Sequence, residues 1–209
     1  MSTISSVEAL AALYPNPVAP ASIAKEIDHV DDNYAALIAA SPFFVLATNG
    51  PEGLDCSPRG DMPGFVRFRD AKTLLIPDRR GNNRLDSLKN ILFDPRIGML
   101  FLVPGYGETL RVNGTALLSS DPELCGQFEM AGKLPACVIV VTVESVYFQC
   151  SRAVVRADLW NPSTQVDRRR LPSAGQILRD ITAKNVEVET FDGEAYDKAL
   201  PERVKATLY

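Results

Sequence analysis

The sequence predicts a mostly β protein in which a small antiparallel β-barrel is flanked by helices. Two observations carry this prediction: short runs of strand character follow one another in hairpin order from Phe43 to Gln149, and few helical patterns interrupt them. The 209 residues fit a single domain with appendages. We expect residues 1–40 to form an N-terminal helical cap, residues 41–160 the barrel core and residues 161–209 a C-terminal helical extension.

The N-terminal region carries apolar residues at helical spacing in residues 21–27 and 34–40, and the second of these patterns ends before Pro42. At Phe43 the apolar period changes from that of a helix to that of a strand, and glycine, proline and asparagine clusters mark the turns. The predicted strands are residues 43–48, 54–57, 65–68, 73–76, 97–103, 109–118, 137–143 and 145–149.

A short helix is predicted to begin at residues 121–123. One longer helix is also predicted inside the run of strands. Asn83 is the expected N-cap, and the helix ends at Asp94-Pro95. Its N-terminus would direct a partial positive charge at the loop of residues 79–84, which favours a bound anion. A further helix is expected over residues 151–160, with Trp160 against the core. The apolar face of the helix after Asn83 consists of Leu85, Leu88, Ile91 and Leu92.

Composition excludes several classes of protein. A formal net charge of -4 argues against general nucleic-acid binding, and the only short basic run is Arg168–Arg170. The longest apolar run, Ala136–Val143, is far shorter than the ~20 residues that span a bilayer, so no membrane association is expected. Because the first residues lack the basic start and apolar core of a secretory signal, we expect a cytoplasmic protein.

The four cysteines contain no closely spaced pair, so we expect reduced thiols. Cys150 is the one cysteine that we place near a pocket, but a nucleophilic thiol needs a basic partner. The single histidine, His29, lies in the N-terminal region. Neither a Cys/His pair nor a transition-metal site is therefore predicted.

Arginine, asparagine and glycine concentrate in three segments that each adjoin a predicted strand: residues 57–61, 76–84 and 108–114. Their polar groups therefore fall where strands end or turn. The planar guanidinium of arginine can donate two hydrogen bonds to phosphate oxygens, and asparagine amides and backbone N–H groups can supply the other donors of an anion-binding site. Any one of these arginines is compatible with an ordinary charged turn, but three segments within one run of strands favour a bound anion.

The segments contain Ser-Pro-Arg-Gly-Asp at 57–61, Ile-Pro-Asp-Arg at 76–79 and Glu-Thr-Leu-Arg-Val-Asn-Gly at 108–114. With their order and the intervening helix, they resemble the pyridoxamine 5′-phosphate oxidase-like family of flavin-binding split β-barrels, and within it a bacterial subgroup. The resemblance spans residues 41–160. It implies an antiparallel six-stranded split barrel that forms a homodimer, with two FMN sites at the interface, each built from both subunits.

The resemblance also implies cofactor-binding roles for residues of this chain. Ser57 and Arg59 match the strand that lines the flavin and reaches its phosphate, and Asp61 closes that segment. Ile76 and Pro77 match the strand end whose backbone faces the isoalloxazine ring. The other matched positions are Arg79, Asn83 and Arg84 in the phosphate clamp, Thr109 where the oxidases place a partner-subunit glutamine against the ring, Arg111 on the same face, and Arg152, Arg156 and Trp160 toward the ring or substrate.

The implied protein is an FMN-binding flavoprotein, and our leading hypothesis is an oxidoreductase that transfers hydride or electrons between a nicotinamide donor and a small organic acceptor. We expect Asp61, Asp78 and Asp86 to orient arginines rather than to act as general acids or bases, and we assign no residue a catalytic role. The arginine-histidine signature with which the oxidases hold pyridoxamine is missing, because His29 is the only histidine. This departure argues against pyridoxamine 5′-phosphate oxidation itself.

Two alternatives remain beside this hypothesis. A non-catalytic flavin-binding carrier, or a redox or stress sensor, would bind FMN without donor-dependent reduction. Relatives of this fold also accept haem or a deazaflavin. Haem takes an axial histidine, cysteine, methionine or tyrosine, and a single histidine outside the barrel pattern argues against it. A deazaflavin has the same ring system with a longer acidic tail, so it stays open beside FMN.

Overall fold

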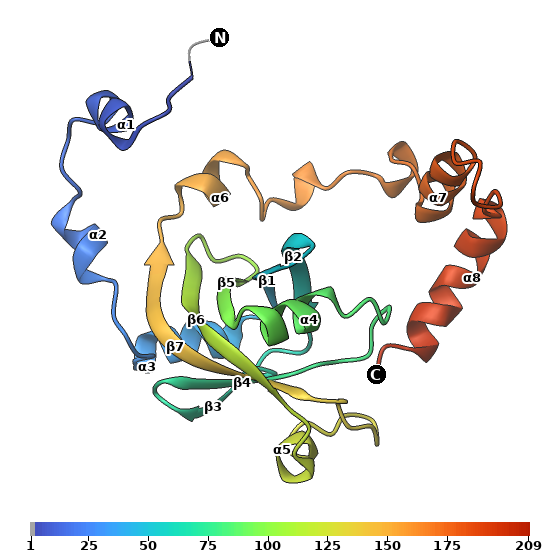
Figure 1. The fold of residues 1–209 in the computed structure, drawn as a ribbon, viewed down its shortest axis with the longest axis horizontal. Helices are drawn as coiled ribbons and strands as arrows, with labels where there is room; N and C mark the ends of the chain where they lie inside the picture. Colours follow the sequence, from blue (N-terminus) through green and yellow to red (C-terminus); the bar gives the residue numbers. More distant parts are fainter. Residues whose placement is uncertain (1–2) are drawn as a thin grey trace.

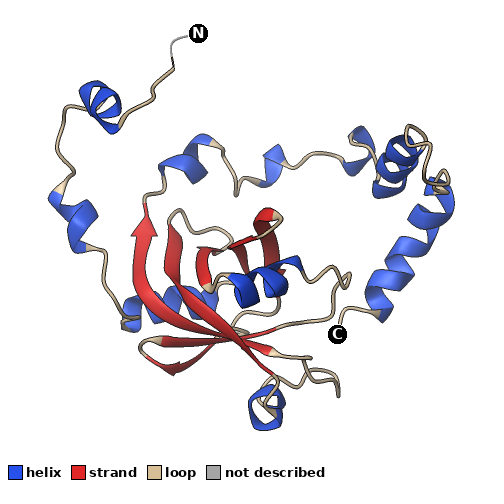
Figure 2. Cartoon of the chain, viewed as in Figure 1, coloured by secondary structure: helices blue, strands red, loops and turns tan. Residues whose placement is uncertain are grey.

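The computed structural model describes residues 3–209, in which one antiparallel sheet curves around a hydrophobic core and helices lie on its outside (Figures 1 and 2). The strands are β1 (Phe43–Gly50), β2 (Gly53–Gly60), β3 (Arg67–Asp70), β4 (Thr73–Pro77), β5 (Arg96–Leu102), β6 (Thr109–Ser119) and β7 (Val138–Gln149). Their order in the sheet is β2-β1-β5-β6-β7-β4-β3, with antiparallel neighbours throughout. The predicted hairpins are present, and the mostly β split-barrel fold class is confirmed.

The sheet has seven strands, so the implied number of six is wrong. β3 is a four-residue exposed strand whose only partner is β4, and without it the sheet would have six. β2 and β3 form the two edges and do not pair with each other in the described chain, so the barrel is not closed.

The core is formed by every second residue of the strands, because successive side chains of a strand point to opposite faces of the sheet. In β1, Phe44 and Leu46 are fully buried, whereas the flanking Phe43 is exposed. The ring of Phe44 lies 5.8 Å from that of Phe65 and 4.9 Å from that of Phe101, measured between centroids. These aromatic contacts join β1, β5 and the segment before β3 in one core.

The first half of β7 departs from this alternation because it is covered on both faces. Ile139 and Val141 belong to the central core, whereas Val138 and Val140 pack against the short helix α5 (Pro122–Gly126). Burial on both faces gives a continuous apolar run, which is why residues 137–143 do not alternate in the sequence.

The two apolar runs predicted at the end of the barrel form a single strand, β7. Its register against β6 shifts between Asn113 and Gly114. A Cβ atom on Gly114 would lie 2.0 Å from the carbonyl oxygen of Thr142, so this β-bulge accepts only glycine. A bulge increases the local bend and twist, which lets β6 and β7 curve across the barrel.

Helix α4 (Asp86–Phe93) connects β4 to β5 and packs on β1 and β6. Leu88 and Ile91 are buried as predicted, but Leu85 and Leu92 are exposed. The predicted apolar face is therefore too wide, because Leu85 precedes the helix rather than belonging to it.

The remaining helices lie outside the sheet, and only some of them contribute to the core. Tyr34 and Ile38 of α3 are buried in the central core, whereas α1 and α2 bury no residue. The helix predicted over residues 151–160 is much shorter, because Asp158 turns the chain with a φ of 49°. These helices are α1 (Val7–Leu13), α2 (Pro20–Ala24), α3 (Asp32–Ala40), α6 (Arg152–Arg156), α7 (Ala174–Thr182), α8 (Gly193–Ala206) and the 3-10 turns η1 (Pro162–Thr164) and η2 (Arg168–Arg170).

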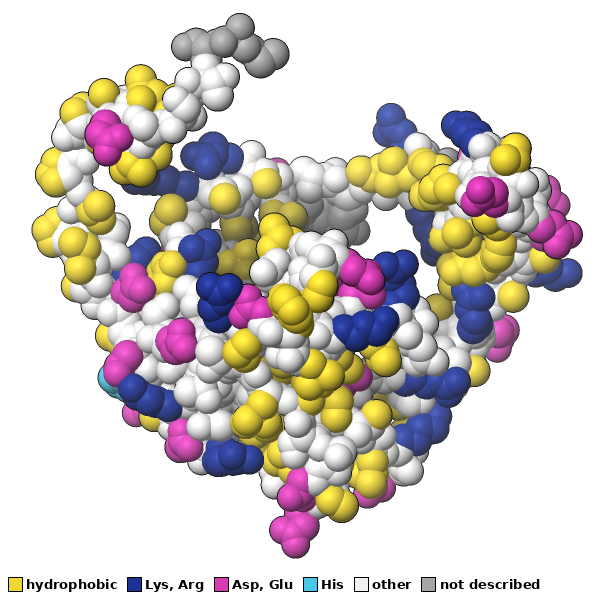
Figure 3. Space-filling view, in the orientation of Figure 1, with side chains coloured by type: hydrophobic (Ala, Val, Ile, Leu, Met, Phe, Trp, Pro, Cys, Tyr) yellow, Lys and Arg dark blue, Asp and Glu magenta, His cyan; other side chains and the backbone are white. Residues whose placement is uncertain are grey.

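Two arms extend from the barrel on opposite sides (Figure 1). One contains α1 and α2, and the other runs from α6 through α7 and α8 before the chain returns to the barrel at its C-terminal end. Hydrophobic side chains are visible on both arms (Figure 3). The division into cap, core and C-terminal extension stays a prediction.

Candidate functional site

A pocket with a cavity volume of about 650 Å³ lies between β2 and the segment that leads from β4 into α4. Small-molecule sites typically occupy ~300–1,000 Å³. The loop after α5 and the last residue of the chain complete the wall. The lining residues are Ser57–Arg59, Asp78–Leu88, Lys133–Ala136 and Tyr209.

Arg59 reaches this pocket from β2. Its Nη1 donates a hydrogen bond to Oδ1 of Asp78 at 2.7 Å, which ties β2 to the residue that follows β4. Only 20% of the Arg59 side chain and 13% of the Asp78 side chain are exposed. The Nε atom of Arg59 is buried and has no hydrogen-bond partner among residues 3–209. Because a buried donor without an acceptor is unfavourable, this arginine retains unused capacity for an acceptor.

Arg79 is held from two sides. Its Nε donates to Oδ2 of Asp61 at 2.8 Å, and its Nη1 donates to the carbonyl oxygen of Phe128 at 2.7 Å. Burial acts to raise the pKa of Asp61, but hydrogen bonds from the backbone N–H of Met62, from the Tyr209 hydroxyl and from Arg79 outweigh it and lower that pKa. Asp61 is therefore a carboxylate that positions Arg79, as the sequence predicted.

The loop before α4 adopts an unusual backbone. Asn83 and Leu85 have φ angles of 59° and 61°, in the left-handed region that few residues other than glycine adopt. The predicted N-cap role of Asn83 is therefore wrong: Leu85 occupies the N-cap position, and no side chain caps the helix. The side-chain oxygen of Asn82 instead accepts a hydrogen bond from the backbone of Arg84 at 3.0 Å.

The start of α4 is part of the pocket wall, and its first turn lacks a side-chain acceptor. Such a helix end offers free N–H groups and a partial positive charge to an anion. Arg84 lies beside it and is paired with Asp86 at 2.7 Å, with 74% of its side chain exposed. Because most of its side chain is exposed, Arg84 is accessible to a ligand that enters from solvent.

The charges around the pocket fit a phosphate monoester. Five lining side chains are cationic, and they face two lining carboxylates and the Asp61 that pairs with Arg79. Among these side chains the excess is two positive charges, and the main-chain oxygen of Tyr209 engages one of the cations, Lys133. A positive excess therefore remains for a phosphate monoester, which carries about -1.5 to -2 at neutral pH. The lining cations are Arg59, Arg79, Arg80, Arg84 and Lys133. Together with the unpaired Nε of Arg59 and the uncapped helix, they suit a phosphate group.

The structure brings together part of the predicted site. Five predicted residues line the pocket, and Asp61 lies directly behind Arg79. Ile76 and Pro77 are buried in β4, where they pair with Ile139 and Val138 of β7, and they do not line the pocket. The five predicted residues in the pocket wall are Ser57, Arg59, Arg79, Asn83 and Arg84.

Thr109 and Arg111 lie outside this pocket, on the outer face of β6. They pair across the sheet with Gln149 and Tyr147 of β7. Nη1 of Arg111 donates to the Tyr147 hydroxyl at 3.0 Å, and the guanidinium lies 5.5 Å from the ring centroid. This arginine is thus oriented by an aromatic neighbour rather than by a carboxylate.

Arg152, Arg156 and Trp160 also lie outside the pocket, in the segment after β7. Both arginines are exposed on α6. Trp160 is half-buried, and its Nε1 donates to the carbonyl oxygen of Tyr106 in the β5–β6 loop at 2.7 Å. In a single chain these residues do not meet the phosphate pocket.

Lys133 and Tyr209 line the pocket but were not predicted from the sequence. Lys133 lies in a Gly-Lys-Leu-Pro stretch, and that turn composition beside a cation was the one available signal. Tyr209 had none, because it contacts Asp61 across 148 positions of sequence.

Among residues 3–209, no three histidine, cysteine or acidic side chains are grouped so as to hold a metal ion. None of the described helices combines the length and the apolar character needed to cross a bilayer.

The fold and the pocket together define a split-barrel protein with a pocket rich in cationic side chains between β2 and α4. The family model described as pyridoxamine 5′-phosphate oxidase matches residues 30–150, more than half of the chain. The chain therefore belongs to the pyridoxamine 5′-phosphate oxidase family. No curated protein matches it significantly.

Several solved structures are similar to part of this chain. HupZ from Group A Streptococcus is 20% identical, with 58% of this chain and 95% of that chain covered and a TM-score of 0.48. The general stress protein 26 from Bacillus anthracis is 15% identical, with coverages of 55% and 88% and a TM-score of 0.41. An FMN-binding protein from Syntrophomonas wolfei is 11% identical, with coverages of 54% and 80% and a TM-score of 0.42. Because these similarities are low, family membership rests on the family model.

Proposed function

We propose that this protein binds FMN and holds its phosphate in the pocket between β2 and α4. The observation that carries the proposal is the convergence of Arg59, Arg79 and Arg84 in one pocket with excess positive charge, within the residues that match the family model. Arginine guanidinium groups and the free backbone N–H groups of an uncapped helix are hydrogen-bond donors that commonly bind phosphate oxygens. The backbone of Ile76 and Pro77 at the end of β4 is proposed to face the ring.

The finer proposal is an oxidoreductase that exchanges hydride or electrons between a nicotinamide donor and a small organic acceptor. When bound, the flavin ring supplies this redox chemistry. The residues of the pocket bind and orient: the carboxylates of Asp61, Asp78 and Asp86 are each paired with an arginine. Such a site suits hydride transfer better than chemistry that needs a free general acid or base.

We further propose that the protein is a homodimer and that the partner supplies ring contacts. Thr109 and Arg111 are displayed on the outer face of the sheet, away from the phosphate pocket of their own chain. Arg152, Arg156 and Trp160 are likewise outside it. A second copy that packs on this face would bring these residues to a ring that extends from the pocket.

A non-catalytic flavin-binding carrier or sensor is the second candidate. It is favoured by one specific observation: within the described pocket wall, the carboxylates are all engaged by arginines, and no histidine is present. Such a protein would share the FMN site but would not accept electrons rapidly from a nicotinamide donor.

The binding proposal is tested by titrating purified protein with FMN and following the quenching of flavin fluorescence. Arg59→Ala is expected to weaken FMN binding by about 10–100-fold, since a charge-assisted contact contributes ~1.5–3 kcal/mol. Arg96→Ala is the matched control, because Arg96 is exposed, pairs with Asp94 and lies outside the pocket. Unchanged affinity in Arg59→Ala would remove this residue from the site, and no FMN uptake by the wild type would refute the proposed function.

The redox proposal is tested on the FMN-loaded protein. Anaerobic NADH or NADPH is expected to bleach the flavin absorbance faster than it reduces free FMN. A flavin that stays oxidised with both donors supports the carrier or sensor, and preferential uptake of a deazaflavin would replace FMN as the ligand.

A further inference from the structure

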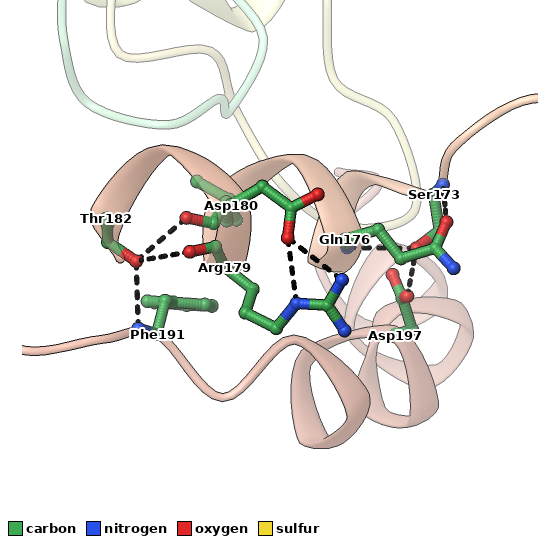
Figure 4. Close-up of polar contacts among 8 residues, drawn as sticks. Ser173, Gln176, Arg179, Asp180, Thr182, Phe191 and Asp197 are labelled. Carbon is green, nitrogen blue, oxygen red and sulfur yellow. Dashed lines mark hydrogen bonds and ion pairs between the residues drawn. The ribbon is translucent and has the colours of Figure 1, made fainter. Parts of the chain in front are cut away.

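The last two helices form a hairpin that holds itself together. Ser173 and Gln176 make a reciprocal capping box at the start of α7. The carboxylate of Asp197 in α8 accepts hydrogen bonds from the Ser173 hydroxyl and, at 2.9 Å, from the backbone of Gly175 (Figure 4). Gly175 and Gly193 pack so closely that a Cβ atom on either would lie within 2.4 Å of the other's carbonyl oxygen.

The other end of the hairpin is closed as well. The backbone N–H of Phe191 donates to Oγ1 of Thr182 at 2.9 Å (Figure 4). The ring of Phe191 packs edge-on against Tyr196, with 5.4 Å between centroids. With bonds at both ends, α7 and α8 form one unit that does not depend on the barrel for its internal contacts.

The polar contacts that the structure describes between this unit and the barrel all involve one residue. In the described part of residues 166–209, every hydrogen bond, ion pair or cation–π contact with the barrel involves Tyr209. Its hydroxyl donates to Oδ1 of Asp61 at 2.9 Å, and its main-chain oxygen accepts from Nζ of Lys133 at 2.6 Å. Its ring lies over Arg79, 5.5 Å from the guanidinium carbon.

These contacts place Tyr209 in the pocket wall without filling the pocket. Tyr209 uses Oδ1 of Asp61, whereas Arg79 uses Oδ2, so both interactions exist at once. The cavity of about 650 Å³ remains with Tyr209 among its lining residues. Docking of the hairpin is therefore compatible with a ligand in the pocket, which favours retention over competition.

We propose that Tyr209 is a latch in the wall of the phosphate pocket and that the α7–α8 hairpin, which leads into Tyr209, is the strap that this latch fastens to the barrel. The ligand retained is a phosphate-bearing cofactor, so this part rests on the proposed function. The latch ties Arg79 and Lys133 in the pocket wall to Asp61 behind it, and we expect the ligand to leave faster when these contacts are lost. Chain segments that move in binding are held by few contacts, as this one is.

The latch itself is tested without flavin, by limited proteolysis of the full-length protein. Tyr209→Ala is expected to speed cleavage in the linker of residues 161–173 several-fold, because the hairpin leaves the barrel. Tyr209→Phe keeps the ring on Arg79 and should lie between this variant and the wild type. Tyr14→Ala is the control, because Tyr14 is 74% exposed on the opposite arm. Equal cleavage of Tyr209→Ala and wild type would overturn the latch.

The strap is tested by the rate at which FMN leaves, measured by mixing loaded protein with an excess of a non-fluorescent flavin competitor. Tyr209→Ala is expected to release FMN about tenfold faster than wild type, since it loses a hydrogen bond to a carboxylate and a cation–π contact. A wild-type release rate in a variant whose hairpin has left the barrel would overturn retention. If the wild type takes up no FMN, the proposed function fails, and the proteolysis comparison alone decides the latch.

Discussion

At the scale of single residues, the site is built from arginines held by carboxylates. Asp78 holds Arg59 and Asp61 holds Arg79, and both pairs are largely buried. Burying two charges is expensive, so such pairs add little to stability when compared with apolar packing. Their effect is to fix the direction of each guanidinium before a ligand arrives, which lowers the entropy lost on binding.

The cysteines give a prediction at the same scale. Burial, with the nearby charge of Asp78, raises the pKa of the Cys137 thiol to about 11, so it stays protonated and unreactive near pH 8. Cys56 and Cys150 are exposed. Mass spectrometry after brief iodoacetamide treatment of native protein should find adducts on these two residues and little on Cys137. Labelling of Cys137 as fast as Cys56 would contradict the burial of this thiol, and labelling in denaturant controls for peptide detection.

At the scale of elements, the fold depends on how β6 and β7 cross. They form the longest pair in the sheet and carry the bulge at Gly114, so both the barrel core and the outer face with Arg111 depend on their register. A slip of one residue would exchange the two faces of a strand. The bulge therefore positions the predicted ring contacts as well as the core.

Gly114→Ala tests this crossing. The added methyl group would overlap the carbonyl oxygen of Thr142, and we expect a loss of about 1–3 kcal/mol in the free energy of unfolding. The measurement is urea denaturation followed by circular dichroism. Gly126→Ala is the control, because a Cβ atom there meets no atom within 4 Å. Equal midpoints for the two variants would show that the bulge tolerates a side chain.

At the scale of the whole molecule, Asp61 connects distant parts of the chain. Its carboxylate receives Arg79 from the loop after β4 and Tyr209 from the C-terminal end. Only 1% of this side chain is exposed. Protonation of one buried carboxylate would therefore weaken the anion pocket and the attachment of the α7–α8 hairpin together.

The pH dependence of stability follows from the lowered pKa of Asp61. A carboxylate whose pKa is lower in the folded state contributes stability above its ordinary value of 3.8 and loses it as the pH falls through the folded-state value. The melting temperature of the wild type should therefore fall more steeply below about pH 4 than that of Asp61→Asn, which cannot titrate. Parallel curves for the two proteins would show that Asp61 is not a source of acid sensitivity.

The sequence by itself determined the local structure and the segments that form the site. Alternation and turn residues specify strands within a few positions, so the hairpins and the sheet were predictable. Arg79 and Arg84 belong to one loop, so their proximity was predictable too. The cap at Asn83 was not, because the left-handed turn at Leu85 moves the start of α4 and has no marker such as glycine.

Only the tertiary structure decided which of these groups meet. The chain offers many arginines and aspartates, and the choice of Asp78 for Arg59 depends on how β2 and β4 are placed in the curved sheet. Lys133 and Tyr209 enter the pocket from a loop and from the far end of the chain. Such long-range contacts depend on how the whole chain folds. The apolar periodicity of a sequence reports only local structure, so no pattern in the sequence predicts these contacts.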